Sequence, residues 1–267
     1  MVLEAIAQGD KGMKISVCGK GGSGKSVLTS LLANQAISHG LGVLVIDSDE
    51  SNSGLFKMLG FEIPPVPLME LVGGKKKLRE KMSHPNILAE SHFSIKEIPP
   101  RHLIRRNGLA LVSIGKILQA LEGCACPMGV LSREFLKKLR LGENEIAIID
   151  MEAGVEHFGR GIDEGIDRIL LVVEPSFESL NVAEKIKGIA EGMNKGVSAV
   201  LNKIDSDKTA HKLESELKIK NIEIIGTIPN DPLVFEACLE GSTIGVGEAF
   251  HAAGRVLDDL LQTSFSG

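Results

Sequence analysis

The 267-residue sequence contains no tryptophan and no tyrosine, and it has only nine phenylalanines. The hydrophobic residues, 43% of the chain, are therefore mainly Ile, Leu, Val and Ala. Aliphatic side chains of this kind fill the buried strands of parallel sheets. A chain of this length has room for one large domain or two small ones.

The chain also lacks a surplus of basic residues, and its formal net charge is −5. Domains that bind nucleic acid carry a basic surface, so this balance argues against such a partner. No apolar run approaches the roughly 20 residues of a membrane-spanning helix. The N-terminal stretch MVLEAIAQGDKG lacks the basic start and long apolar centre of a signal peptide. We therefore expect a cytoplasmic protein that binds neither nucleic acid nor a membrane.

Cysteine is scarce, and two of the four cysteines stand one residue apart, at Cys124 and Cys126 in EGCACPMG. Cytoplasmic thiols stay reduced, so such a pair indicates metal binding or redox chemistry rather than a disulfide. A structural zinc site usually has two to four residues between its cysteines, so this pair is too close for one. A chance pair near a turn is the alternative. Cys18 is expected to be buried in a strand, and Cys238 to be a core residue of a helix.

Short apolar runs alternate with helical patterns along most of the chain. This alternation predicts an α/β fold with a mostly parallel central sheet and helices on both faces, in three layers. The strands are expected at 14–18, 42–47, 109–114, 145–150, 168–174, 197–203 and 223–229. The helices are expected at 26–40, 132–141, 179–193 and 247–262.

The domain organisation follows from the same pattern. Residues 1–12 are expected to form an N-terminal extension, and 13–267 a single domain. The stretch from about 61 to 108 contains PPVP, GGKKK and IPP, and is expected to be an irregular surface insertion with loops and short helices. A long insertion is often functional, so a partner-binding role stays open. The helix at 247–262 carries Asp258, Asp259 and one Arg, so we expect it to pack on the sheet rather than lie on a membrane.

Residues 19–26, GKGGSGKS, match the phosphate-binding pattern GxxxxGK[ST] completely, after a predicted strand and before a predicted helix. The glycines let backbone N–H groups approach phosphate oxygens. Lys25 is suited to reach the β- and γ-phosphates, and the Ser26 hydroxyl to ligate Mg²⁺. The predicted nucleotide-binding residues here are Gly19, Lys20, Gly21, Gly22, Ser23, Gly24, Lys25, Ser26 and Val27.

A second lysine, Lys20, gives the loop the pattern KGGxGK[ST]. In this respect the sequence resembles the deviant P-loop ATPases, which include MinD, ParA and the nitrogenase iron protein. The resemblance implies a P-loop NTPase fold and a dimer that sandwiches two nucleotides. It also implies that Lys20 of one subunit reaches the phosphates bound in the other, as an arginine finger does in trans.

Acidic residues end two of the predicted strands, where ligands of α/β proteins bind. The resemblance implies that Asp49 in IDSDES positions the attacking water, while Asp47 helps to hold Mg²⁺, often through water. In IIDMEAG it implies that Asp150 lies beside the Mg²⁺ shell and that the Gly154 N–H contacts the γ-phosphate.

Two weaker signals concern the nucleotide base. Asn202 in LNKID corresponds to the asparagine that hydrogen-bonds the base edge in the resembled ATPases. Pro229 and Asn230 in the turn IPND are expected to supply backbone contacts to adenine. Both patterns also occur by chance.

The CAC motif and the stretch DMEAGVEHFGRG (150–161) resemble the CooC-type ATPases, which help to mature nickel enzymes such as carbon monoxide dehydrogenase. The resemblance implies ATP and ADP as nucleotides, Mg²⁺ as cofactor and nickel insertion as function. The client would be an apo nickel enzyme, carbon monoxide dehydrogenase or acetyl-CoA synthase. The chain departs from the common pattern at Glu152, where glycine is frequent, and at Ser26, where threonine is usual. His157 is as well suited to a structural hydrogen bond as to a metal.

Two cysteines supply two thiolates, whereas most soft-metal sites need four donors. A two-fold homodimer places the same surface opposite itself, so Cys124 and Cys126 of both subunits would complete an S₄ site. Zn²⁺, Ni²⁺ and an iron–sulfur cluster all accept such a donor set. Two other functions therefore stay open: a MinD/ParA-type positioning ATPase, and an electron-transfer ATPase that carries a cluster.

Overall fold

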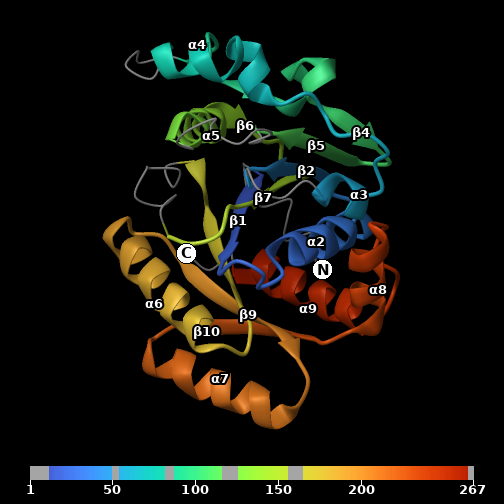
Figure 1. Cartoon of the computed structure of the whole chain (residues 1–267), viewed down its shortest axis with the longest axis vertical. Helices are drawn as coiled ribbons and strands as arrows, with labels where there is room; N and C mark the ends of the chain where they lie inside the picture. The colour runs from blue at the N-terminus through green and yellow to red at the C-terminus, as the bar shows by residue number, and fades with distance from the viewer. Residues whose placement is uncertain (1–11, 50–53, 82–86, 116–125, 156–164, 264–267) are drawn as a thin grey trace.

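An eight-stranded sheet runs through the middle of the molecule, with its strands in the order β10-β9-β8-β1-β7-β2-β5-β4 (Figure 1). The computed structural model describes residues 12–49, 54–81, 87–115, 126–155 and 165–263. Every neighbouring pair is parallel except β4 with β5. The strands are β1 (Met13–Gly19), β2 (Gly42–Asp47), β4 (Ile104–Arg106), β5 (Leu109–Ser113), β7 (Glu145–Asp150), β8 (Arg168–Val173), β9 (Val197–Ile204) and β10 (Glu223–Pro229).

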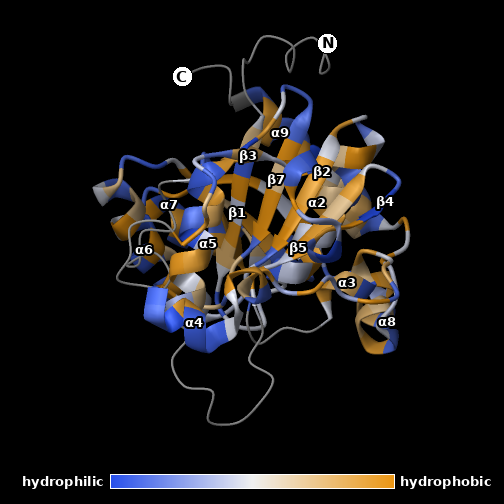
Figure 2. Ribbon diagram, turned by 90° about the horizontal axis from the view of Figure 1, so that it is seen from above, coloured by the Kyte–Doolittle hydropathy of each residue, from blue (hydrophilic) through white to orange (hydrophobic). Residues whose placement is uncertain are grey.

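The central strands divide their side chains between two apolar cores, one on each face of the sheet. In β2, Val43 and Val45 belong to one core, whereas Leu44 and Ile46 belong to the other. This division follows from the two-residue period of a strand. Both faces are covered, so the strands read as continuous apolar runs, and Figure 2 shows them as the most hydrophobic part of the ribbon.

On one face lie α2 (Lys25–Ser38) and α9 (Glu248–Thr263), with the shorter α3 (Leu55–Met58) and α8 (Pro232–Glu240) beside them (Figure 1). The apolar side of α9 is buried through Ala253, Val256 and Leu257, which pack in the core shared with α2 and β10. This packing confirms the prediction for the C-terminal helix. Among the described residues, no helix is both long and apolar enough to span a bilayer.

On the other face lie α5 (Cys126–Lys138), α6 (Phe177–Gly192) and α7 (Asp207–Ile219). The three-layer α/β prediction is therefore confirmed. Ser176 and Ser206 cap α6 and α7 by accepting hydrogen bonds from backbone N–H groups of the first turns. The sequence pattern did not predict α7, because this helix buries only Leu213 and Leu217 in a mostly charged stretch.

The described part of the segment 61–108 consists of short helices, short strands and connecting loops, and it also contributes side chains to the core. It contains η1 (Leu68–Val72), α4 (Gly74–Lys81), β3 (Phe93–Ser94), η2 (Ile95–Glu97), η3 (Pro100–His102) and β4. β3 pairs with β6 (Leu139–Arg140), directly after α5. Leu68, Leu78 and Phe93 are buried in the same core as α5, and the rings of Phe93 and Phe135 lie 5.1 Å apart. The apolar residues escaped recognition because Pro, Gly and Lys separate them.

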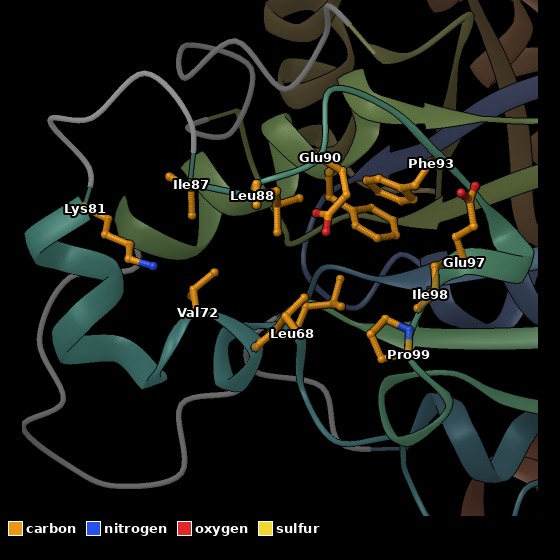
Figure 3. Close-up of a pocket in the computed structure, with 13 residues that line it drawn as sticks. Leu68, Val72, Lys81, Ile87, Leu88, Glu90, Phe93, Glu97, Ile98 and Pro99 are labelled. Atoms are coloured by element: carbon orange, nitrogen blue, oxygen red, sulfur yellow. The ribbon is translucent and has the colours of Figure 1, made fainter.

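This packing leaves a pocket of about 450 Å³ between η1, α4 and residues 87–99 (Figure 3). Its lining is mainly apolar, and Phe135 of α5 contributes to it. Lys81, Glu90 and Glu97 supply charged groups at its edge. The inward side chains of α5, among them Leu131, Phe135 and Leu136, are nevertheless buried in the core.

The cysteine predictions have different outcomes. Cys18 is buried in β1, as predicted. Cys238 lies in a helix, as predicted, but it is exposed rather than in the core. The reason is that α8 is a surface helix whose buried contact is made by the neighbouring Ala237. Cys124 lies outside the described residues, and Cys126 is the first residue of α5.

Glu134 fastens α5 to the segment that covers it, and this contact should depend on pH. Its carboxylate accepts hydrogen bonds from the N–H groups of Ile87 and Leu88, both at 2.9 Å, and from Lys138 Nζ at 2.6 Å. Burial raises the pKa of Glu134, but the hydrogen bonds from Lys138, Leu88 and Ile87 outweigh burial, so its pKa lies below the ordinary 4.5.

Because the folded-state pKa is lowered, the stabilisation is present above the unfolded value and is lost as pH falls through the folded value. We therefore expect Glu134→Gln to lower the free energy of unfolding at pH 7, and the difference from wild type to shrink below about pH 4.5. Urea denaturation at a series of pH values measures this. A difference that grew as pH fell would contradict the assigned role.

Candidate nucleotide-binding site

The carboxyl ends of three adjacent strands bring the predicted phosphate and metal residues together. β1 ends at Gly19, β2 at Asp47 and β7 at Asp150. Asp47 and Asp150 are direct register partners in the parallel pair of β2 and β7. Parallel strands end at one edge of a sheet, so residues about 100 positions apart become neighbours there.

The phosphate loop leads from β1 into α2. Gly24 occupies the N-cap position with φ +99°, and no side chain caps the helix. A β-carbon at Gly24 would lie 2.2 Å from Asn202 Nδ2, so both the conformation and the space require glycine. Lys25 is buried, and its Nζ lies 3.4 Å from the Lys20 carbonyl oxygen. An uncapped helix start with a lysine as its first residue favours an anion.

The metal site can be tested on Asp150, which is fully buried. Its Oδ2 accepts a hydrogen bond from Ser26 Oγ at 2.6 Å, whereas its buried Oδ1 has no hydrogen-bond partner among the described residues. Burial raises the pKa of Asp150 to about 7, with the Ser26 hydrogen bond opposing and the charge of Asp47 adding to the effect. A buried carboxylate with an open oxygen beside a hydroxyl fits a hard cation.

This donor set fits Mg²⁺ bound together with a nucleotide. Within the described ranges, no group of three or more His, Cys, Asp or Glu side chains is arranged to hold a metal alone. Mg²⁺ is typically held by one or two carboxylates, waters and substrate phosphates rather than by a complete protein cage. Ser26 and the nearby Asp47 and Asp150 are the residues that would hold it.

The two predicted switch segments contact each other and the phosphate loop. The Ser48 N–H donates to the Asp150 carbonyl oxygen at 3.0 Å. The Gly154 N–H donates to the Gly19 carbonyl oxygen at 3.2 Å. A contact of the Gly154 N–H with a γ-phosphate, as predicted, would therefore replace a bond to the loop. Asp49 is buried at the end of this edge.

Lys20 is held within its own subunit by Glu174, a residue that no motif in the sequence identifies. Lys20 Nζ lies 2.7 Å from Glu174 Oε1, and Lys203 Nζ lies 2.8 Å from Glu174 Oε2. Burial raises the pKa of Glu174, but hydrogen bonds from both lysines outweigh it and lower the pKa. The available signal was an acidic residue directly after the apolar strand β8 and before a proline.

The predicted base-binding residues are packed against the loop. Asn202 Nδ2 donates to the Ser23 carbonyl oxygen at 2.7 Å, so this side chain fixes the loop in addition to any base contact. The Asn230 N–H donates to the Ile204 carbonyl oxygen at 2.9 Å, directly after Pro229. Asp231, which was not among the predicted site residues, accepts hydrogen bonds from the N–H groups of Leu233 and Ala249 and thereby fixes the starts of α8 and α9. The base contacts of Asn202, Pro229 and Asn230 stay predictions.

The three-layer fold, the phosphate loop and the acidic strand ends define a P-loop nucleotide-hydrolysing protein. Residues 15–244 match the family model of the CobQ/CobB/MinD/ParA nucleotide-binding domain. The chain belongs to this family and is a P-loop ATPase.

Two relatives cover most of the sequence. An uncharacterized ATP-binding protein of Methanocaldococcus jannaschii is 44% identical over 237 residues, which is 87% of this chain and 94% of that protein. The carbon monoxide dehydrogenase accessory protein CooC of Rhodospirillum rubrum is 30% identical over 227 residues, 83% of this chain and 85% of that protein.

Solved structures agree on the fold. The cell division ATPase MinD of Pyrococcus furiosus superimposes with a TM-score of 0.68 at 18% identity, covering 94% of this chain and 99% of that one. At this identity the likeness concerns the fold alone.

The burial of Asp150 leads to a prediction about both the thermal stability and the ATP hydrolysis of the protein. We expect Asp150→Asn to keep the hydrogen bond from Ser26 while removing a buried charge that raises the energy of the nucleotide-free protein. The variant should have an unchanged or higher Tm but should lose Mg²⁺-dependent ATP hydrolysis.

Thermal unfolding without nucleotide and phosphate release with MgATP measure the two effects. Binding of ADP in EDTA serves as the control, because it does not require the metal and should be retained. Mg²⁺-dependent turnover at the wild-type rate would remove Asp150 from the metal site.

Proposed function

We propose that this ATPase is a metallochaperone that delivers nickel to an apo nickel enzyme, with ATP-dependent dimerisation controlling a site built from Cys124 and Cys126. The observation that carries the proposal is a buried hydrogen bond between the nucleotide site and the helix that begins at Cys126. Ser48 Oγ and Ser132 Oγ lie 3.1 Å apart, and both side chains are buried. Ser48 stands between Asp47 and Asp49, and Ser132 lies in the middle of α5.

The far end of α5 is also attached to the nucleotide-binding strand. Lys14 of β1 is buried, and its Nζ donates to the carbonyl oxygens of Leu136 and Leu139, both at 2.7 Å. A movement of the Asp47–Asp49 segment on nucleotide binding would therefore act on α5 near its centre.

The comparison with CooC supports the choice of cargo. That protein is an accessory protein of carbon monoxide dehydrogenase and aligns with 83% of this chain. Two thiolates per subunit give four donors in a two-fold dimer, which suits a soft or borderline cation such as Ni²⁺ or Zn²⁺. The client would be carbon monoxide dehydrogenase or acetyl-CoA synthase.

The residues act on ATP in distinct roles in this proposal. Lys25 binds the β- and γ-phosphates, and Lys20 of the partner subunit stabilises the negative charge that develops during transfer. Asp49 orients a water that attacks the γ-phosphorus as the bond to the ADP oxygen breaks, giving ADP and phosphate. Mg²⁺, when bound, neutralises charge on the phosphate oxygens.

A MinD/ParA-type positioning ATPase is the second candidate, favoured by the fold likeness to MinD. Its output would be binding to a membrane or DNA. The apolar side of the C-terminal helix α9 is buried in the core and is therefore not available as a membrane anchor. ATP-dependent co-sedimentation with anionic liposomes or with DNA, without bound metal, would favour this candidate over the metallochaperone.

The metal site is tested by replacing both thiols. We expect Cys124→Ser/Cys126→Ser to lose about one Ni²⁺ or Zn²⁺ per dimer, because serine hydroxyls do not replace thiolates for a soft-metal site. Elemental analysis of the purified dimer measures the loss, and ADP affinity should be retained. Cys238→Ser is the matched control, since it removes an exposed thiol outside the proposed site. Unchanged metal content in the double variant would refute the shared site.

The coupling path is tested by Ser132→Ala. Removing this hydroxyl should leave metal stoichiometry intact but abolish the change in Ni²⁺ affinity caused by MgATP, because the hydrogen bond to Ser48 is broken. Ni²⁺ titration with and without MgATP measures the difference. Ser30→Ala is a control that removes another buried hydroxyl, one that donates to the Met58 carbonyl oxygen on the opposite face of the sheet. An unaltered response of Ser132→Ala to MgATP would exclude this path.

A further inference from the structure

Three charged side chains gather where three neighbouring strands end beside the phosphate loop. Gly19 of β1 pairs with Val172 of β8, and Val173 of β8 pairs with Leu201 of β9. Lys20, Glu174 and Lys203 follow these positions on the three strands. β8 lies between β1 and β9, so its glutamate stands between the two lysines.

Glu174 uses one carboxylate oxygen for each lysine. Oε1 accepts from Lys20 Nζ at 2.7 Å, and Oε2 accepts from Lys203 Nζ at 2.8 Å. Its side chain is only 14% exposed, whereas that of Lys20 is 32% exposed. Its backbone N–H donates to Ser179 Oγ at 3.1 Å, which attaches Glu174 to the first turn of α6. The glutamate is therefore the fixed member, and both lysines are more accessible than it, since the Lys203 side chain is 46% exposed.

Lys203 is held by more than this ion pair. Its Nζ also donates to the Gly22 carbonyl oxygen in the phosphate loop at 2.5 Å. Its backbone adopts φ +60°, which is uncommon for a residue with a long side chain. Such a conformation persists where surrounding contacts enforce it, frequently at functional sites. Lys203 thus stays beside Glu174 when other contacts of the carboxylate change.

We infer that Glu174 is a positioning residue that holds Lys20 within its own subunit until nucleotide-driven dimerisation transfers this lysine to the partner's phosphates. The inference rests on the proposed trans role of Lys20. Because Lys203 keeps neutralising Glu174, the departure of Lys20 does not leave an unpaired carboxylate. The Lys20–Glu174 contact opposes closure of the dimer, once in each subunit.

The effect of the Lys20–Glu174 contact on the dissociation constant of the dimer can be measured. A partly exposed ion pair contributes little by itself, but two pairs must break in each dimer. Their loss should tighten the dimer by about 3- to 30-fold in Kd. We expect this shift for Glu174→Gln, which keeps the shape of the side chain and removes its charge. Glu174→Asp, with a shorter side chain, should shift the Kd in the same direction by a smaller factor.

The experiment is sedimentation velocity of the full chain with Mg²⁺ and a non-hydrolysable ATP analogue. Glu184→Gln is the matched control, because Glu184 pairs with Lys220 at 2.5 Å between α6 and α7, on strand-connecting helices rather than in the loop. The control should leave the Kd unchanged. In a Lys20→Ala background, Glu174→Gln should not restore dimerisation, because the lysine that the glutamate holds is gone.

The outcomes separate this inference from the proposed function. In one outcome, wild type dimerises and Lys20→Ala does not, but Glu174→Gln gives an equal or higher dimer Kd. In that case Glu174 does not hold Lys20 back, while the trans role of Lys20 stands. If wild type and Lys20→Ala dimerise equally, or if neither does, the trans role fails and the holding role fails with it.

Discussion

The parallel pairing of β1, β7 and β2 is the constraint on which the site depends. It sets Asp47 beside Asp150 and ends β1 at the phosphate loop, so that Ser26 Oγ meets the buried Asp150 carboxylate. Burying that carboxylate is unfavourable in the absence of a cation, as its raised pKa indicates. The buried carboxylate thus raises the free energy of the nucleotide-free protein, and binding of a metal ion with a nucleotide can lower it again.

Two further contacts lie at the same edge of the sheet, one between hydroxyl groups and one between charged groups. Ser48 and Ser132 form a buried contact between uncharged hydroxyls, which suits the transfer of a small displacement from the acidic segment to α5. Lys20, Glu174 and Lys203 form a partly exposed ionic contact, which suits exchange of one partner for another. One connection would carry the nucleotide state to the thiols, and the other would regulate when two subunits close.

Most of the fold and the phosphate loop could be predicted from the sequence, because glycine and lysine spacing and apolar runs are local signals. The predicted strand at 42–47 coincides with β2, and that at 145–150 with β7. Contacts made in three dimensions could not be predicted in this way. Glu174 carries no local pattern, since its role depends on β8 lying between β1 and β9.

The remaining differences have similar causes. The core contributions of residues 61–108 are dispersed among Pro, Gly and Lys, so no periodic pattern reveals them. Cys238 stands in an apolar stretch, yet α8 lies on the surface and buries only one of its sides, at Ala237. The start of α5 at Cys126 rather than near 132 also matters, because it joins the CxC motif directly to the helix that contacts Ser48.

In the proposed mechanism, nucleotide binding brings two half-sites together around one metal ion. Native mass spectrometry of the nickel-loaded wild-type protein, with and without Mg²⁺ and a non-hydrolysable ATP analogue, tests it most directly. We expect a nucleotide-dependent dimer that carries one metal ion for two chains. One ion on each monomer, or a dimer without bound metal, would contradict it.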